Sequence, residues 1–455
     1  FNILTKKTVS LSEYDSYPFL IPSIYLDFII EKEGVVVESL MIIKPSANNN
    51  SQLILQGNKI ELLSLLINEK ELKPEEYSIL ENELVIYSPP SSEFKLKIKS
   101  KIDPFNNTSL EGLYLSSGML TTQCEAEGFR SICYHPDRPD VLSKYTVRLE
   151  ADKGLYPVLL SNGNNKFSGN LSNNRHETIW EDPFPKPSYL FALIAGNLKE
   201  ISDSYLTKNG RLIEIKIYVE IGDEKYTQHA IKSLKKAMKW DEDKYGLEYD
   251  LDEYKIVAVR HFNMGAMENK GLNIFNSKLV LADSKTATDD ELERIESVIA
   301  HEYFHNWTGN RITCRDWFQL SLKEGLTVFR DQSFTSDLHG YGLKRIEDVS
   351  FLRNFQFAED KGPTSHAVKP KEYVAIDNFY TTTIYEKGAE LVRMLQLLLG
   401  KERFMRGINV YIKTFDGKAA TTDDFINSLI KGAYSDEIEP TFDVDKFNNW
   451  YYQRG

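Results

Sequence analysis

The chain has 455 residues, of which 41% are hydrophobic and 27% are charged, enough to bury the cores of two or three domains. Its formal net charge of −12 and its pI near 5.4 argue against nucleic acid or an anionic membrane as the main partner. Three cysteines without a C-x-x-C pair, the lack of a signal-peptide pattern and of long apolar runs exclude a disulfide framework and a membrane span, and predict a cytoplasmic protein.

The first part of the chain predicts β-structure. EFKLKIKSKI at 93–102 alternates apolar and lysine side chains, which is typical of a half-buried strand, and similar segments follow at 144–152 and 155–163. DPFPKP at 182–187 holds three prolines, which we expect to interrupt strand pairing. These patterns predict an N-terminal antiparallel β-domain over residues 1–197.

Helical patterns dominate the second part, a predicted domain over residues 198–455. A helix is predicted over 224–246 and a buried strand at 256–259. Another helix begins at about 289, where Thr288 and Glu291 form an S/T-x-x-E capping box. Further helices are predicted around 317–338, 349–359, 385–399, 401–415 and 421–434.

Residues 301–305 read HEYFH, two histidines four apart with a glutamate between. In a chain with eight histidines, roughly 0.01 H-E-x-x-H matches are expected by chance. On a helix, His301 and His305 share one face, and both imidazoles can reach one ion at roughly 2.0–2.1 Å. Apolar side chains such as Ile295 and Ile299 lie on the opposite face. The pair therefore predicts a zinc site, with satisfied surface histidines as the alternative.

Two histidines leave zinc short of a third protein ligand, and Glu324 is the candidate. It follows His305 after 18 residues, which leaves room for a loop and the start of an antiparallel helix. A His₂Glu set with one open position is typical of a catalytic zinc site, whereas a solvated helix residue is the alternative. Glu302 would then take a proton from water and pass it to the leaving amine. The residues alone predict a zinc hydrolase, favour a peptidase, and leave endopeptidase and exopeptidase open.

Other segments carry a family resemblance that extends over nearly the whole chain. GAMEN at 265–269, followed by HEYFHNWTGN at 301–310 and then Glu324, resembles the aminopeptidase N family of gluzincin metallopeptidases, and most of all the bacterial-type alanyl aminopeptidases. The likeness includes TQCEAEGFR (122–130), DPFPKPSYLFALIAGNL (182–198) and FYTTTIYEKGAELVRML (379–395).

The resemblance implies a role for each matching residue. The implied zinc ligands are His301, His305 and Glu324, with Glu302 as general base and Tyr385 as the donor to the oxyanion. The implied substrate-binding residues are Glu125 and Glu268 for the free α-ammonium, Gly265 and Ala266 for backbone pairing, and Gln123 and Met264 for the first side-chain pocket. These roles make chemical sense, because a buried ammonium needs carboxylates and an oxyanion needs a neutral donor.

The resemblance also implies a fold and an activity. We expect an α+β protein whose second domain is thermolysin-like and mainly helical. The expected function is that of a monomeric zinc aminopeptidase with one Zn²⁺ per chain, which releases neutral or basic N-terminal residues from peptides. Family members of this type continue for several hundred residues past a point like WYYQRG, through a final domain that covers the active site. We therefore expect this chain to be an N-terminal portion of such a protein, with uncertain activity of its own.

Two features depart from the family pattern or leave alternatives. Arg260 and His261 stand where related sequences often carry an acidic residue and an aromatic one, which would alter charge beside the GAMEN segment. A leukotriene hydrolase, which adds epoxide hydrolysis to aminopeptidase activity, is an alternative enzyme. An inactive peptide-binding module is the alternative from another class, although it would have no need to keep Glu302.

Overall fold

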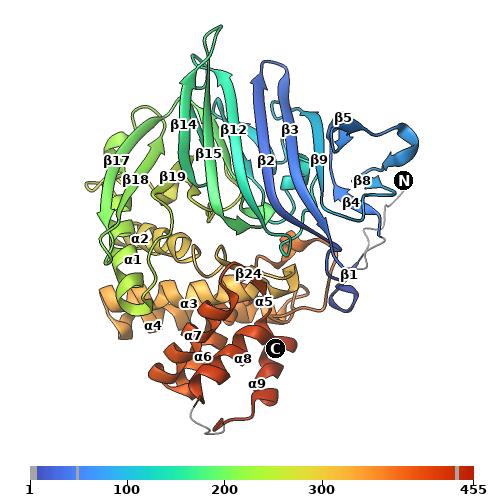
Figure 1. Ribbon diagram of the computed structural model, residues 1–455. Coiled ribbons are helices and arrows are strands. Elements are labelled where there is room, and N and C mark those ends of the chain that lie inside the picture. The colour runs from blue at the N-terminus through green and yellow to red at the C-terminus, as the bar shows by residue number, and fades with distance from the viewer. Residues whose placement is uncertain (1–7, 48–50, 436–439) are drawn as a thin grey trace. The chain divides into compact units, whose positions relative to one another are not determined.

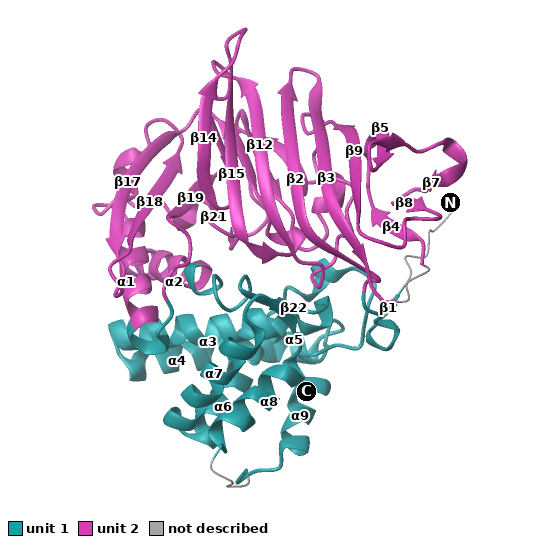
Figure 2. Cartoon of the chain, in the orientation of Figure 1, with its two compact units in different colours: residues 1–16, 243–247, 303–455 teal, residues 17–242, 248–302 magenta. Residues whose placement is uncertain are grey.

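The computed structural model describes residues 8–47, 51–435 and 440–455. The chain forms two compact units (Figure 2): unit 1 contains 1–16, 243–247 and 303–455, and unit 2 contains 17–242 and 248–302. Unit 2 holds most of the strands and unit 1 most of the helices, so the predicted α+β class, β-rich first and helical second, is confirmed. The units divide the chain at other positions than the predicted boundary at 197, which stays a prediction.

An eight-stranded sheet is the largest element of unit 2 (Figure 1). Its neighbouring strands are antiparallel, except β12 and β2, which are parallel. In spatial order the strands are β14 (Asn164–Asn170), β15 (Arg175–Lys186), β12 (Ser143–Asp152), β2 (Phe19–Glu31), β3 (Gly34–Pro45), β9 (Phe94–Ile102), β5 (Glu61–Ile67) and β6 (Lys70–Glu71).

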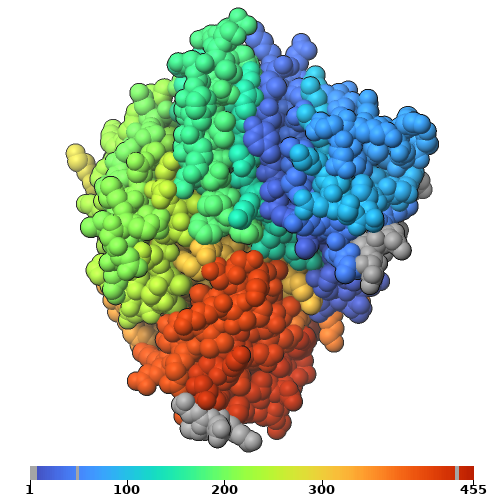
Figure 3. Space-filling view, in the orientation of Figure 1, coloured from blue at the N-terminus to red at the C-terminus, as the bar shows by residue number. Residues whose placement is uncertain are grey.

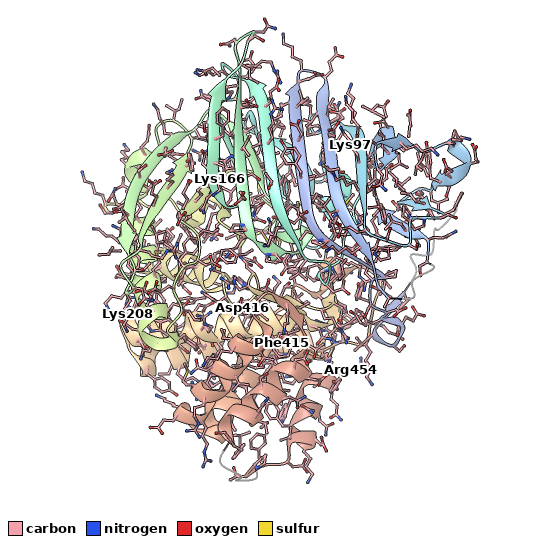
Figure 4. The ribbon with its side chains drawn as sticks, viewed as in Figure 1. Lys97, Lys166, Lys208, Phe415, Asp416 and Arg454 are labelled. Carbon is pink, nitrogen blue, oxygen red and sulfur yellow. The ribbon has the colours of Figure 1, made fainter. Side chains whose placement is uncertain are left out.

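Strand β9 shows why this sheet forms. Its apolar side chains, such as Leu96 and Ile98, are buried, while the lysines between them point to the other face, as the alternation predicts. Lys97, labelled in Figure 4, forms an ion pair of 2.9 Å with Glu38 on the neighbouring β3. Figure 3 shows this outer face of unit 2, with β12, β2 and β3 next to one another on the surface. One face therefore packs in the core and the other carries cross-strand charge pairs.

The prolines of 182–187 do not end strand β15 before Lys186, so the expected interruption at this segment is wrong in part. The pairing of β12 with β15 passes from Asp182 directly to Lys186, with a register shift opposite Ser143 and Tyr145. Pro183 and Pro185 lie in the skipped stretch, where the missing N–H breaks no ladder bond.

Three smaller sheets complete the β-structure of unit 2. One has the order β10 (Gly112–Ser116), β11 (Met119–Gln123), β16 (Leu193–Gly196), β13 (Val158–Ser161), and another β4 (Leu53–Gln56), β8 (Glu83–Ile86), β7 (Tyr77–Ile79). The third has the order β17 (Lys199–Leu206), β18 (Leu212–Val219), β19 (Glu253–Val259), β21 (Leu272–Asn276), β20 (Ala266–Met267). Because β17 and β18 follow residue 197, the expected change to helices there is wrong; LIEIKIYV of β18 alternates as a strand does.

Two long helices start in unit 2, namely α1 (Gln228–Tyr245), after the short turn η5 (Glu224–Tyr226), and α2 (Asp289–Phe304). The capping box of α2 is confirmed: the backbone N–H of Glu291 donates to Thr288 Oγ1 at 3.2 Å, and that of Thr288 donates to Glu291 Oε2 at 2.8 Å. The remaining 3₁₀ turns of the described chain are η1 (Leu11–Glu13), η2 (Pro74–Glu76), η3 (Phe129–Ser131), η4 (Ser188–Leu190), η6 (Ser277–Leu279), η7 (Trp317–Gln319) and η9 (Ile376–Phe379).

Unit 1 is mainly helical, around a core that includes Leu326, Phe329 and Phe404. Its helices are α3 (Leu320–His339), α4 (Tyr341–Phe351), α5 (Phe357–Lys361), α6 (Gly388–Leu399), α7 (Lys401–Phe415), α8 (Thr422–Ala433) and α9 (Val444–Tyr452), with π-helical turns η8 (Leu352–Gln356) and η10 (Thr383–Lys387). Two strand pairs add β1 (Val9–Ser10) with β23 (Glu372–Tyr373) and β22 (Ile312–Cys314) with β24 (Lys418–Ala420).

The helix predicted at 349–359 starts earlier, because α4, η8 and α5 follow one another from Tyr341 to Lys361. The helices predicted around 385–399, 401–415 and 421–434 match α6, α7 and α8 closely. None of the helices in the described residues has the length and apolar character needed to cross a bilayer.

His135 makes the stability of unit 2 depend on pH. Its ring is fully buried against Phe129, with centroids 5.3 Å apart, and both ring nitrogens lack a hydrogen-bond partner. Burial lowers the pKa of His135 from 6.5 to about 3. Below pH 6.5 the unfolded chain therefore takes up a proton that the folded chain does not, which removes up to about 1.4 kcal/mol of stability per pH unit down to about pH 3.

We expect His135→Leu to flatten this acid limb. Thermal unfolding midpoints at pH 7, 5.5 and 4.5 should fall less for the variant than for the wild type. His339→Asn, a change at an exposed histidine, is the matched control and should keep the wild-type slope. Equal slopes for His135→Leu and wild type would contradict the prediction.

Candidate metal centre and active site

Helix α2 positions the first metal-ligating candidates. Its N-terminus carries Asp289 and Asp290, which favour the positive end of the helix dipole, and its apolar face is buried at Ile295 and Ile299. His301 lies in the last turn and is half-buried. His305 follows the last helical residue and is 1% exposed. The helix therefore presents the two imidazoles one turn apart, as expected.

Glu324 meets His305 inside unit 1. It lies in the second turn of α3, is 2% exposed, and its Oε2 is 3.1 Å from His305 Nε2. The other oxygen, Oε1, accepts a hydrogen bond of 2.6 Å from Nζ of Lys323, which is 1% exposed. The two oxygens of this carboxylate are thus assigned to different partners.

The loop after His305 is anchored at its far end. Arg311 donates from Nε and Nη2 to the carboxylate of Asp416, at 2.8 and 2.7 Å, and its guanidinium stacks on Trp307 at 4.4 Å. Asp416, labelled in Figure 4, directly follows α7. The strands β22 and β24, which follow the two residues, pair in parallel. This bidentate contact ties the segment that carries His305 to the helical core.

The donor set suits a zinc ion. The ligand atoms of His301, His305 and Glu324 lie within 4.8 Å of one another. Ligands at 2.0–2.1 Å from a tetrahedral ion lie about 3.3 Å apart, close to the 3.1 Å between His305 Nε2 and Glu324 Oε2. Two imidazoles and one carboxylate are the ligand types that catalytic zinc sites use, so the residues fit this metal.

Three carboxylates gather in unit 2. A carboxylate oxygen of Glu268 lies within 4.8 Å of one of Glu302 and of one of Glu125. All three residues are at most 6% exposed. Gln123, at the end of β11, donates from Nε2 to the backbone carbonyl of Glu125 at 3.1 Å, which links it to the residue before the turn. Buried carboxylates this close favour a bound cation.

The GAMEN segment forms the edge of the five-stranded sheet. Strand β20 is the last in the sheet order, and Ala266 pairs with Phe275 of β21. The carbonyl of Gly265 accepts from the N–H of Asn276 at 2.8 Å, and Gly265 is exposed while Met264 is half-buried. An edge strand can accept an extended peptide as a further strand.

Arg260 and His261 have partners in unit 2. Arg260 binds the carboxylates of Glu220 at 2.8 Å and Asp223 at 2.6 Å, so its charge is matched locally. Nδ1 of His261 lies 3.2 Å from Ser116 Oγ. The departure from the family pattern therefore brings its own acidic partners.

Tyr385 lies in the π-helical turn η10 of unit 1 and packs against the unit 1 core. Ser321 of α3 donates to the carbonyl of Ile384 at 2.9 Å, and a Cβ on Gly325 would lie 2.8 Å from the backbone of Gly388. This close approach places the backbone of η10 beside the turn of α3 that carries Glu324. The π-turn was not predicted; such turns are frequent at functional sites.

The sequence analysis missed a buried group around His305, made of Thr308, Thr327 and Arg330. Thr327 follows Glu324 by three residues, so it lies on the same face of α3. That spacing was a usable signal for Thr327, whereas Thr308 and Arg330 show no comparable pattern.

Two family models match the chain. The peptidase M1 N-terminal domain matches residues 22–190, and the peptidase family M1 domain matches residues 229–450. Aminopeptidase N of Caulobacter vibrioides is 51% identical over 99% of this chain and 51% of the relative, and Aminopeptidase N of Escherichia coli K12 is 50% identical over 97% of this chain and 50% of the relative. The chain thus spans about half the length of the curated relatives it matches.

A solved structure is similar as well. The crystal structure of Legionella pneumophila aminopeptidase A in complex with aspartic acid has a TM-score of 0.91 and 36% identity, over 99% of this chain and 51% of that chain. Together, the two family models, the identities near one half and the shared fold show that this chain belongs to peptidase family M1.

Proposed function

We propose that this chain carries the active site of a zinc-dependent aminopeptidase, with His301, His305 and Glu324 as ligands of one zinc per chain. The observation that carries the proposal is the His₂Glu cluster at the end of α2, whose ligand atoms lie within 4.8 Å of one another. The printed names of the relatives, Aminopeptidase N, support the exopeptidase assignment.

In the proposed mechanism, each residue has a separate task. Zinc, when bound, would lower the pKa of water and polarise the scissile carbonyl. Glu302, buried and next to a ligand in the chain, takes the proton of the attacking water and delivers it to the leaving amine. The hydroxyl of Tyr385 donates to the oxyanion. Glu125 and Glu268 bind the substrate α-ammonium, which fixes the scissile bond one residue from the N-terminus.

The proposal extends to substrate and setting. The substrates are peptides with a free N-terminus and a neutral or basic first residue, since Gln123 and Met264, the proposed pocket residues, offer no cation for an acidic side chain. Backbone pairing uses Gly265 and Ala266 at the edge of β20. We also propose a monomeric cytoplasmic enzyme, without nucleic-acid or membrane partners and with a domain division at 197; the net charge of −12 and three free, buried cysteines support this setting.

We expect about one zinc per chain in the wild type and almost none in the His301→Ala/His305→Ala double variant, because a single carboxylate cannot retain the ion. Elemental analysis after dialysis measures this ratio. His339→Ala, at an exposed histidine, is the control and should retain the wild-type zinc content. Stoichiometric zinc in the double variant would place the metal elsewhere.

A second candidate specificity comes from the similar solved structure, an aminopeptidase A with bound aspartic acid. Turnover of a panel of aminoacyl amides separates the two: alanyl and arginyl substrates should exceed aspartyl and glutamyl ones. A preference for acidic residues would favour the second candidate. An epoxide substrate tests the leukotriene hydrolase alternative, and absence of turnover with peptide binding retained would favour a binding module.

A further inference from the structure

The ring of His305 is held on the side away from Glu324. Its Nδ1 lies 2.9 Å from the carbonyl oxygen of Thr308 and 3.2 Å from Thr327 Oγ1. His305, Thr308 and Thr327 are at most 5% exposed. A carbonyl oxygen can only accept, so Nδ1 carries the proton and Nε2 keeps its lone pair. Nε2 is the nitrogen that faces Glu324, on the side of the proposed ion.

The group that accepts from Nδ1 is itself fixed. The hydroxyl of Thr327 donates to the carbonyl of Thr308 at 3.0 Å, and the two threonine hydroxyl oxygens are 2.9 Å apart. Arg330 donates from Nη1 to Thr308 Oγ1 at 3.1 Å and to the carbonyl of Phe304 at 2.9 Å. Arg330 is fully buried, and its guanidinium lies 4.8 Å from the Phe304 ring centroid. It therefore holds the C-terminal carbonyls of α2 and the Thr308 hydroxyl together.

Gly309 leaves the space that the ring needs. Its φ of +148° is a conformation that other residues rarely adopt, and a Cβ there would lie 2.8 Å from His305 Nδ1. The ring is thus bounded by hydrogen-bond partners and by backbone without a side chain.

We propose that Thr327, supported by Thr308 and Arg330, is a positioning residue that fixes the tautomer and orientation of His305 as a metal ligand. The inference rests on the proposed zinc site. Partners of the second nitrogen of a ligating histidine commonly change metal affinity by about 10–100-fold when they are removed. The hydroxyl of Thr327 meets both Nδ1 and its acceptor, so its loss should affect the ring more than the fold.

The test measures the zinc dissociation constant of the whole chain by competition with a chromophoric chelator. Thr327→Val keeps the shape and removes the hydroxyl, and we expect about 10–100-fold weaker zinc binding. Thr327→Ser keeps the hydroxyl and should stay within about threefold of wild type. Thr335→Val is the matched control: Thr335 is on the same helix, 1% exposed, and its hydroxyl has no hydrogen-bond partner, so zinc affinity should not change.

Two further measurements separate positioning from general stability. The thermal midpoint of metal-free Thr327→Val should match that of Thr335→Val, while the visible spectrum of its Co²⁺ form should differ from that of wild type. Gly309→Ala, which crowds the ring without removing a hydrogen bond, should also weaken zinc binding. Wild-type zinc affinity in Thr327→Val, or an equal loss in Thr327→Ser, would contradict the inference. A wild-type chain that binds no zinc would contradict the proposed function itself.

Discussion

Glu302→Gln is expected to lower kcat by about 10²–10⁴-fold while zinc content and peptide binding are retained, because an amide has the shape of the carboxylate but cannot take a proton. Glu302 is 6% exposed and adjoins His301 in the last turn of α2. The measurement is steady-state hydrolysis of alanyl amides, with zinc determined on the same samples.

Glu296→Gln is the matched control for this change. Glu296 is a buried glutamate on the same helix, and its carboxylate pairs with Lys236 at 2.5 Å. Its substitution should affect stability and leave kcat near the wild-type value. Turnover of Glu302→Gln within a few fold of wild type would assign the base to another residue.

N-acetylation of a peptide substrate is expected to lower kcat/KM by at least about 10³-fold. The proposed clamp consists of Glu125 and Glu268, whose carboxylate oxygens lie within 4.8 Å of each other in a buried position. Acetylation removes the cation and leaves these charges facing a neutral amide, and an uncompensated buried charge costs several kcal/mol. Each of Glu125→Gln and Glu268→Gln should reduce the ratio of free to acetylated turnover, mainly through slower cleavage of free-amine peptides.

The control for the clamp is Glu242→Gln. Glu242 is 5% exposed and accepts from the Tyr205 hydroxyl at 3.0 Å and the Lys208 backbone at 3.1 Å, so it represents a buried structural glutamate. It should leave the ratio unchanged. If the ratio were unchanged in Glu125→Gln and Glu268→Gln as well, both would be structural and the aminopeptidase assignment would be wrong.

Local patterns predicted those elements whose signals lie within a few residues. The capping box at Thr288 and Glu291 marked the start of α2, and alternation marked β9. The end of β15 was missed, because whether a proline disrupts a ladder depends on the register of the partner strand, here the shift opposite Ser143 and Tyr145. The π-turn η10 was missed for a related reason, since one extra residue per turn leaves little trace in the hydrophobic period.

The candidate site divides in the same way. His301, Glu302 and His305 were readable from spacing on one helix, whereas Glu125, Glu268 and Tyr385 came only through family resemblance, because carboxylates and tyrosines are common. The groups behind His305 could not be predicted, since Arg330 meets Phe304 and Thr308 only once α3 packs beside the end of α2. Their contacts are a property of the packed unit.

The hydrogen bond from Lys323 to Oε1 of Glu324 has a consequence for which metals this site can retain. With one oxygen already bound by an ammonium group, Glu324 presents a single oxygen, and the other two donors are imidazoles. Calcium prefers six to eight oxygen ligands, often with bidentate carboxylates, and magnesium prefers an octahedron of oxygens. A one-oxygen, two-nitrogen site satisfies neither, so Lys323 helps this site to discriminate against the alkaline-earth ions that are abundant in cells.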